Sequence, residues 1–83
     1  MGTWQVALVR EQGVEFGVVV VNDHVLDNPR EREKLLSSWS LQLQRPVALM
    51  GAHRHRTFGR RDLVDWLSGV HSPRLPWREI TIN

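Results

Sequence analysis

Two segments near the start of the chain have the hydrophobic pattern of β-strands. Residues 3–9, TWQVALV, alternate polar and apolar side chains, and residues 14–21, VEFGVVVV, are mostly β-branched and apolar. The segment REQG between them ends in Gly13, and glycine suits a tight hairpin turn. This pattern predicts an antiparallel pair of strands.

The segment NPREREKLLSSWSLQLQ, residues 28–44, predicts an amphipathic helix. Asn28 can cap the helix N-terminus, Pro29 suits the first helical position, and Glu31 lies three residues after the cap. We expect one side of this helix to pack on the sheet, because its apolar residues recur at spacings of three and four. These residues are Leu35, Leu36, Trp39 and Leu43.

Three further elements follow. Residues 46–51, PVALMG, are a short apolar run that predicts a buried third strand. Residues 60–68 predict a second amphipathic helix, because apolar side chains follow the helical period and Gly69 can cap its C-terminus. Residues 77–83, WREITIN, alternate again and predict a last strand.

These elements predict a single α/β domain over residues 1–83, on the border with α+β. The order is ββαβαβ, in a mixed four-stranded sheet with two amphipathic helices. Strand–helix–strand connections make the second, third and last strands parallel, with the first strand antiparallel at an edge. One alternative stays open: residues 55–58 pair back on residues 47–52 as a hairpin, with His53 and Arg54 at the turn.

Composition restricts the class of protein. A chain of 83 residues has a small core. It contains no cysteine, which excludes disulfides and thiolate zinc sites and favours a reducing, cytoplasmic setting. The N-terminus lacks a signal-peptide pattern, and the longest apolar run, residues 18–21, is too short to cross a bilayer. We therefore expect a cytoplasmic protein with no membrane partner.

Charge is distributed unevenly although the net charge is only +2. From Arg45 to Arg61 there are five arginines and no acid. Much of this basic segment would leave the carboxyl end of the third strand, beside residues 22–24, where open α/β sheets bind ligands. Arg60 and Arg61 would also start the second helix, where cations are unfavourable unless an anion is bound.

The basic segment is therefore a candidate site for nucleic acid or a phosphate ligand. Its residues are His53, Arg54, His55, Arg56, Arg60 and Arg61. The alternative is that the arginines are solvated or pair with Asp23, Asp27 and Asp62, which this arrangement brings near. The segment has no P-loop, helix-turn-helix or RNA-recognition motif.

No catalytic residue, metal or cofactor is expected. His53 and His55 could share one strand face, but the flanking arginines oppose a metal cation. The serines lie in no nucleophile-elbow motif, and the acids near the first helix suit its N-terminus rather than acid–base catalysis. An enzyme remains the less favoured class.

The strand pattern also predicts a candidate interface. If both helices covered one face of the sheet, the other would expose an apolar strip around Ala7, with Val9, Val19, Val21 and Trp77 as interface residues. A homodimer would cover that strip. The alternative is a three-layer monomer in which the second helix lies across that face.

The favoured function is a small non-enzymatic binding protein. It would be a homo-oligomer, or bind a protein partner, through the apolar sheet face and the basic loop. The alternative function is binding of nucleic acid or a phosphate ligand by the basic segment.

Overall fold

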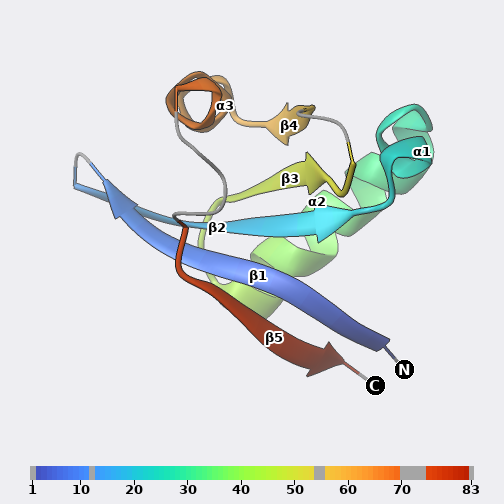
Figure 1. Ribbon diagram of the computed structural model, residues 1–83, viewed down its shortest axis with the longest axis horizontal. Helices are drawn as coiled ribbons and strands as arrows, with labels where there is room; N and C mark the ends of the chain where they lie inside the picture. The colour runs from blue at the N-terminus through green and yellow to red at the C-terminus, as the bar shows by residue number, and fades with distance from the viewer. Residues whose placement is uncertain (1, 12, 54–55, 70–74, 83) are drawn as a thin grey trace.

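The computed structural model describes residues 2–11, 13–53, 56–69 and 75–82. In these ranges the chain forms an α+β domain with a mixed five-stranded sheet and three helices (Figure 1). The elements are β1 (Gly2–Glu11), β2 (Val14–Val21), α1 (Asp23–Leu26), α2 (Pro29–Leu43), β3 (Val47–Gly51), β4 (Thr57–Gly59), α3 (Arg61–Ser68) and β5 (Trp77–Ile82).

The strand order in the sheet is β4-β3-β2-β1-β5. β2 and β3 are parallel and joined through α1 and α2, whereas the other neighbours are antiparallel. The predicted directions are therefore right, since β2, β3 and β5 all run the same way. The predicted edge position of β1 is wrong, because β5 pairs with the outer side of β1.

The hairpin alternative is confirmed for residues 57 and 58, with the strand running on to Gly59, so the four-stranded prediction is wrong; Arg54 and His55, which the alternative placed in the turn and the strand, lie outside the described residues. β4 pairs back on β3, with Met50 opposite Thr57 and Ala48 opposite Gly59. A glycine is needed at the end of β4: Gly59 has a φ of 152°, and a Cβ there would lie 3.1 Å from the Cα of Ala48. The one-turn helix α1 was not predicted, since four residues are too few to show a helical period.

Each face of the sheet has its own core. On one face, Val6, Val19 and Leu49 pack with Trp39 of α2, which lies behind the sheet in Figure 1. On the other face, α3 contributes Leu63 and Leu67, which pack with residues from β1, β2 and β3. The domain thus has three layers, with α2 and α3 on opposite faces.

This arrangement corrects the predicted apolar strip. Val9, Val19 and Val21 are only 8%, 0% and 3% exposed. The register places Val6 opposite Val19, so Val19 and Val21 face α2 while Val9 faces α3. The layering of the three-layer alternative is therefore right, and both faces of β2 are apolar because each meets a helix. Trp77, the other predicted interface residue, is half-buried beside the core under α3.

The helix ends agree with the sequence pattern. Asn28 caps α2, since its Oδ1 accepts hydrogen bonds from the backbone N–H groups of Arg30 (3.1 Å) and Glu31 (3.2 Å). α3 ends at Ser68, with Gly69 as its C-cap. None of the described helices combines the length and apolar character needed to cross a membrane.

The Asn28 cap can be tested by substitution. Asn28→Ala leaves two N–H groups of α2 without this acceptor, so we expect the free energy of unfolding to fall by about 1 kcal/mol. Asn28→Asp keeps an acceptor and should be close to wild type. Urea denaturation followed by circular dichroism measures both, and equal stabilities for the two variants would contradict the cap.

Candidate functional site

His53 and Arg56, from the first part of the basic segment, lie at the carboxyl ends of β2 and β3, as predicted, whereas Arg60 and Arg61 follow β4 at the opposite end of β3. Ala52 N–H donates to the Val21 carbonyl at 2.9 Å, which places the residue after β3 beside the end of β2. Gly51 N–H donates to the Arg56 carbonyl at 2.9 Å and starts the return into β4. His53 and Arg56 are therefore held next to α1, which follows β2.

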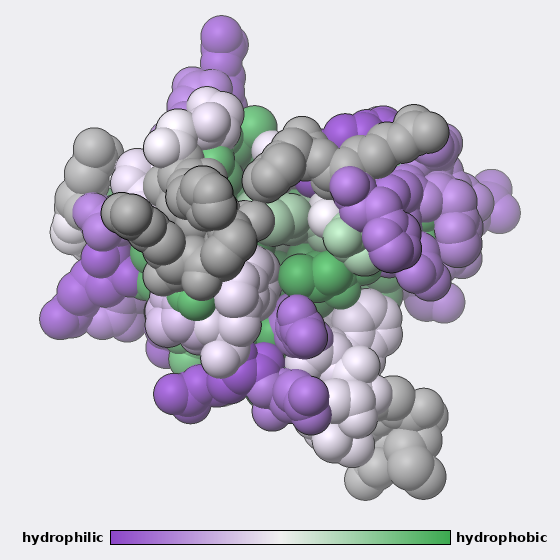
Figure 2. Space-filling view, viewed as in Figure 1, coloured by the Kyte–Doolittle hydropathy of each residue, from purple (hydrophilic) through white to green (hydrophobic). Residues whose placement is uncertain are grey.

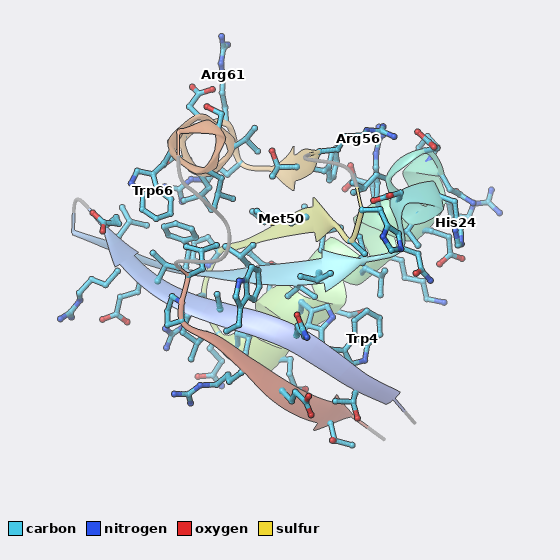
Figure 3. The ribbon with its side chains drawn as sticks, in the orientation of Figure 1. Trp4, His24, Met50, Arg56, Arg61 and Trp66 are labelled. Carbon is cyan, nitrogen blue, oxygen red and sulfur yellow. The ribbon has the colours of Figure 1, made fainter. Side chains whose placement is uncertain are left out.

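Two acids near α1 contact the basic segment. Arg56 Nη1 forms an ion pair with Asp27 Oδ1 at 2.7 Å, and His53 N–H donates to Asp23 Oδ1 at 3.3 Å. In Figure 3, Arg56 lies beside α1. The ion pair is partly exposed to solvent, so it contributes about 0–1 kcal/mol to stability. Its main effect is to occupy the Arg56 guanidinium with an internal partner.

Arg60 is paired in the same way at the start of α3. Its Nε and Nη2 contact Asp62 Oδ1 and Oδ2 at 2.7 and 2.6 Å. The hydrogen bond from Arg60 is the main reason why the pKa of Asp62 is lowered, and the same bond raises the pKa of Arg60. Asp62 also accepts the Leu63 N–H at 3.0 Å. Arg60 is the N-cap of α3, so this carboxylate offsets the cation at the helix start.

The structure thus confirms the predicted pairing with carboxylates for two arginines, Arg56 and Arg60. Arg61 is different: it is exposed, points away from the domain in Figure 3, and has no side-chain hydrogen bond or ion pair within the described residues. Arg54 and His55 lie outside the described residues. Arg56 and Arg61 come from different ends of β4 and do not converge on one point.

Arg32 is a structural cation that the sequence analysis missed. Its Nη1 donates to the Leu26 carbonyl at 2.9 Å, and its Cζ lies 4.4 Å from the centre of the Phe58 ring. Its Nε is buried without a hydrogen-bond partner. Arg32 therefore joins the ends of α1 and β4 to α2. Its position seven residues before Trp39, on the buried side of the helix, was the available signal.

A shallow depression lies between the start of β1 and the end of β2. Its volume is about 290 Å³. Figure 2 shows hydrophobic surface near the middle of one face, bordered by hydrophilic side chains. No charged side chain lines the depression, whose described lining residues are Thr3, Trp4, Val20, Val21, Asn22 and Ala52. Within the described ranges, no three potential metal-ligating side chains come together.

The free edge of β5 was not predicted as a site. In the described sheet, β5 pairs only with β1 and forms one of the two outer edges. Arg78, Glu79 and Thr81 are exposed along it. Ile80 is half-buried and belongs to the same apolar cluster as Trp4, whose ring lies 5.6 Å from that of Trp39 in an edge-to-face contact. Trp77, at the start of β5, is the one predicted interface residue on this edge.

Comparison of the chain with protein-family models, curated proteins and solved structures found no match.

The Arg60–Asp62 contact predicts a specific pH dependence. Because the folded-state pKa of Asp62 is lowered, the pair stabilises the fold above the ordinary carboxyl pKa, and this stabilisation is lost as pH falls through the lowered value. We expect Arg60→Ala to raise the pKa of Asp62 toward its ordinary value. Arg61→Ala removes a neighbouring charge but not the hydrogen bonds, so it should shift the pKa much less. Carbon-detected NMR titration measures the pKa, and equal shifts in the two variants would contradict the pairing.

Proposed function

We propose that this protein is a small non-enzymatic interaction module that binds a partner by strand addition to the free edge of β5. The observation that carries this proposal is that β5, a six-residue strand, is an outer edge of the sheet. Figure 1 draws no described element outside it. A partner strand placed there would accept and donate main-chain hydrogen bonds along its length.

The composition of β5 supports this use of the edge. A free edge presents unpaired N–H and C=O groups, and proteins usually blunt such edges with charges, proline, bulges or short strands. Arg78 and Glu79 charge the first half of β5, but residues 80–82, Ile-Thr-Ile, carry no charge, proline or glycine. The opposite edge, β4, is only three residues long and ends at Gly59. β5 is therefore the better template for another strand.

The side chains beside the edge offer an apolar surface to an added strand. Ile80 is opposite Trp4 of β1, and both side chains are only partly buried on the α2 face. A partner strand with an apolar residue next to Ile80 would extend this cluster outward. The opposite face is polar here, since Gln5, Glu79 and Thr81 are exposed. The preferred partner segment therefore alternates apolar and polar residues.

Binding of nucleic acid or a phosphate ligand by the basic segment is the second candidate, and fewer observations support it. Arg56 and Arg60 already have carboxylate partners, so a phosphate would have to compete with Asp27 and Asp62. Arg61 is the described arginine of this segment that is free to bind an anion. A single phosphate contact predicts a weak interaction whose affinity falls roughly in inverse proportion to salt concentration.

Strand addition can be tested with a synthetic peptide of sequence TVTVTV, titrated to millimolar concentration. We expect it to slow hydrogen exchange of alternate amides along β5, because those N–H groups point outward and become bonded to the peptide. A scrambled, proline-containing peptide is the control. Exchange that is unchanged at β5, or slowed only elsewhere, would overturn the proposal.

Two adjacent proline variants provide an internal control, because successive N–H groups of a strand point to opposite edges. The registers of β1, β2 and β3 direct the N–H of Ile80 toward β1 and the N–H of Thr81 outward, so Thr81→Pro removes an outward N–H and Ile80→Pro removes one that faces β1. We expect Thr81→Pro to lose peptide binding with little loss of stability. Ile80→Pro should cost about 1 kcal/mol or more of unfolding free energy. Loss of binding that simply follows loss of stability would contradict strand addition.

A further inference from the structure

We infer that the partner strand at the β5 edge is β5 of a second copy of this chain, in antiparallel orientation. This inference rests on the proposed function of that edge. The product is a two-fold symmetric dimer in which two five-stranded sheets join into one sheet of ten strands. The side chains of β5 determine in which register the strand can pair with itself.

Symmetry restricts the register. A two-fold axis perpendicular to the sheet keeps the α2 face of both copies on the same side, so opposite residues must face the same side of the sheet. In β5, Ile80 faces α2, as does its partner Trp4. Trp77 faces the α3 side, as does its partner Ala7. Glu79 is two residues after Trp77 and therefore also faces the α3 side. The two registers that pair the most residues of β5 place the axis through a pair of Glu79 residues or through a pair of Ile80 residues.

Side-chain chemistry separates these two registers. Centring the pair on Glu79 places two carboxylates directly opposite each other, with Cβ atoms about 4.5–5.5 Å apart, which is destabilising. Centring it on Ile80 places isoleucine opposite isoleucine and Glu79 opposite Thr81. Arg78 then lies opposite position 82, which is an isoleucine. No like charges are directly opposite in this register, so the geometry favours Ile80 at the axis.

The Ile80 register also extends an existing apolar cluster. Ile80 packs against the cluster that contains Trp4 and Trp39 but is only half-buried, so part of its surface is still exposed. A second Ile80 would cover that surface and continue the cluster across the axis. The same contact is made twice, so the interface is closed and does not propagate. A six-residue edge is a small interface, so we expect a reversible dimer.

Cysteine cross-linking tests the inference directly, because the chain contains no cysteine of its own. Opposite residues of an antiparallel pair have Cα atoms about 4.5–5.5 Å apart, within the range that a disulfide spans. Ile80→Cys should therefore form a disulfide-linked dimer under mild oxidation. Glu79→Cys is the matched control, since its copies would be diagonal neighbours about 7–8 Å apart and on the other face. We expect at least a tenfold faster cross-linking of Ile80→Cys, measured on non-reducing gels.

The mass of the cysteine-free protein provides the second measurement. Sedimentation equilibrium should show a mass that rises from one chain toward two as concentration increases. The proline variant that blocks the outward N–H should remain a single chain while retaining wild-type stability. Three results would overturn the inference. The first is faster cross-linking of Glu79→Cys than of Ile80→Cys, and the second is a dimer in which neither cysteine variant cross-links. The third is a protein that remains a single chain at millimolar concentration.

The two proposals fail in different ways. A protein that stays a single chain but binds the TVTVTV peptide along β5 refutes self-pairing and leaves strand addition intact. A protein that neither dimerises nor binds the peptide refutes both. A dimer that persists in both proline variants uses another surface and also refutes self-pairing through β5.

Discussion

Burial on both faces of one small sheet is the constraint on which this structure depends. β2 and β3 direct alternate side chains to α2 and to α3, and most of them are buried. A chain of this length buries only about 60–65% of the surface that its unfolded form exposes. Large rings therefore supply much of each core, with Trp39 against Trp4 on one face and Trp66 against Phe16 on the other.

Internal pairing of charge follows from the same compact arrangement. The parallel connection of β2 and β3 brings the residues after each strand together, so Asp27 meets Arg56. Arg32 reaches from α2 to the Leu26 carbonyl and the Phe58 ring. These cations hold short elements in place, and Arg56 has an internal partner that a ligand would have to displace. With both faces covered and two of the arginines paired, the outer edge of β5 is the surface that we propose for recognition.

Local pattern predicted much of the fold. The β1–β2 pair, the capped helix α2, β3 and α3 were all recognisable, because each is long enough to show its own period or cap. β4 and α1, with three and four residues, are too short to do so. The wrongly predicted apolar strip has a different cause. Alternation sorts each strand into two faces, but only the register, Val6 with Val19, says which faces coincide.

Part of the candidate site could also be predicted from the sequence, and part could not. Pairing of Arg60 with Asp62 could be expected from their closeness in sequence, and pairing of Arg56 with Asp27 from the parallel sheet. The free edge could not, because it depends on β5 crossing the domain to pair with β1 rather than with β3. No local feature of residues 77–82 specifies that choice.

The pairing of β5 with β1 has a consequence for how the protein is made. β1 and β5 are the first and last strands in the chain, yet they lie side by side, and both ends of the chain in Figure 1 are at the same end of the sheet. Until residues 77–82 leave the ribosome, the ten residues of β1 are an uncovered edge. That edge is longer than the one β5 later presents, and exposed strand edges of incomplete chains promote aggregation. β1 is therefore protected only once residues 77–82 are free of the ribosome and pair with it.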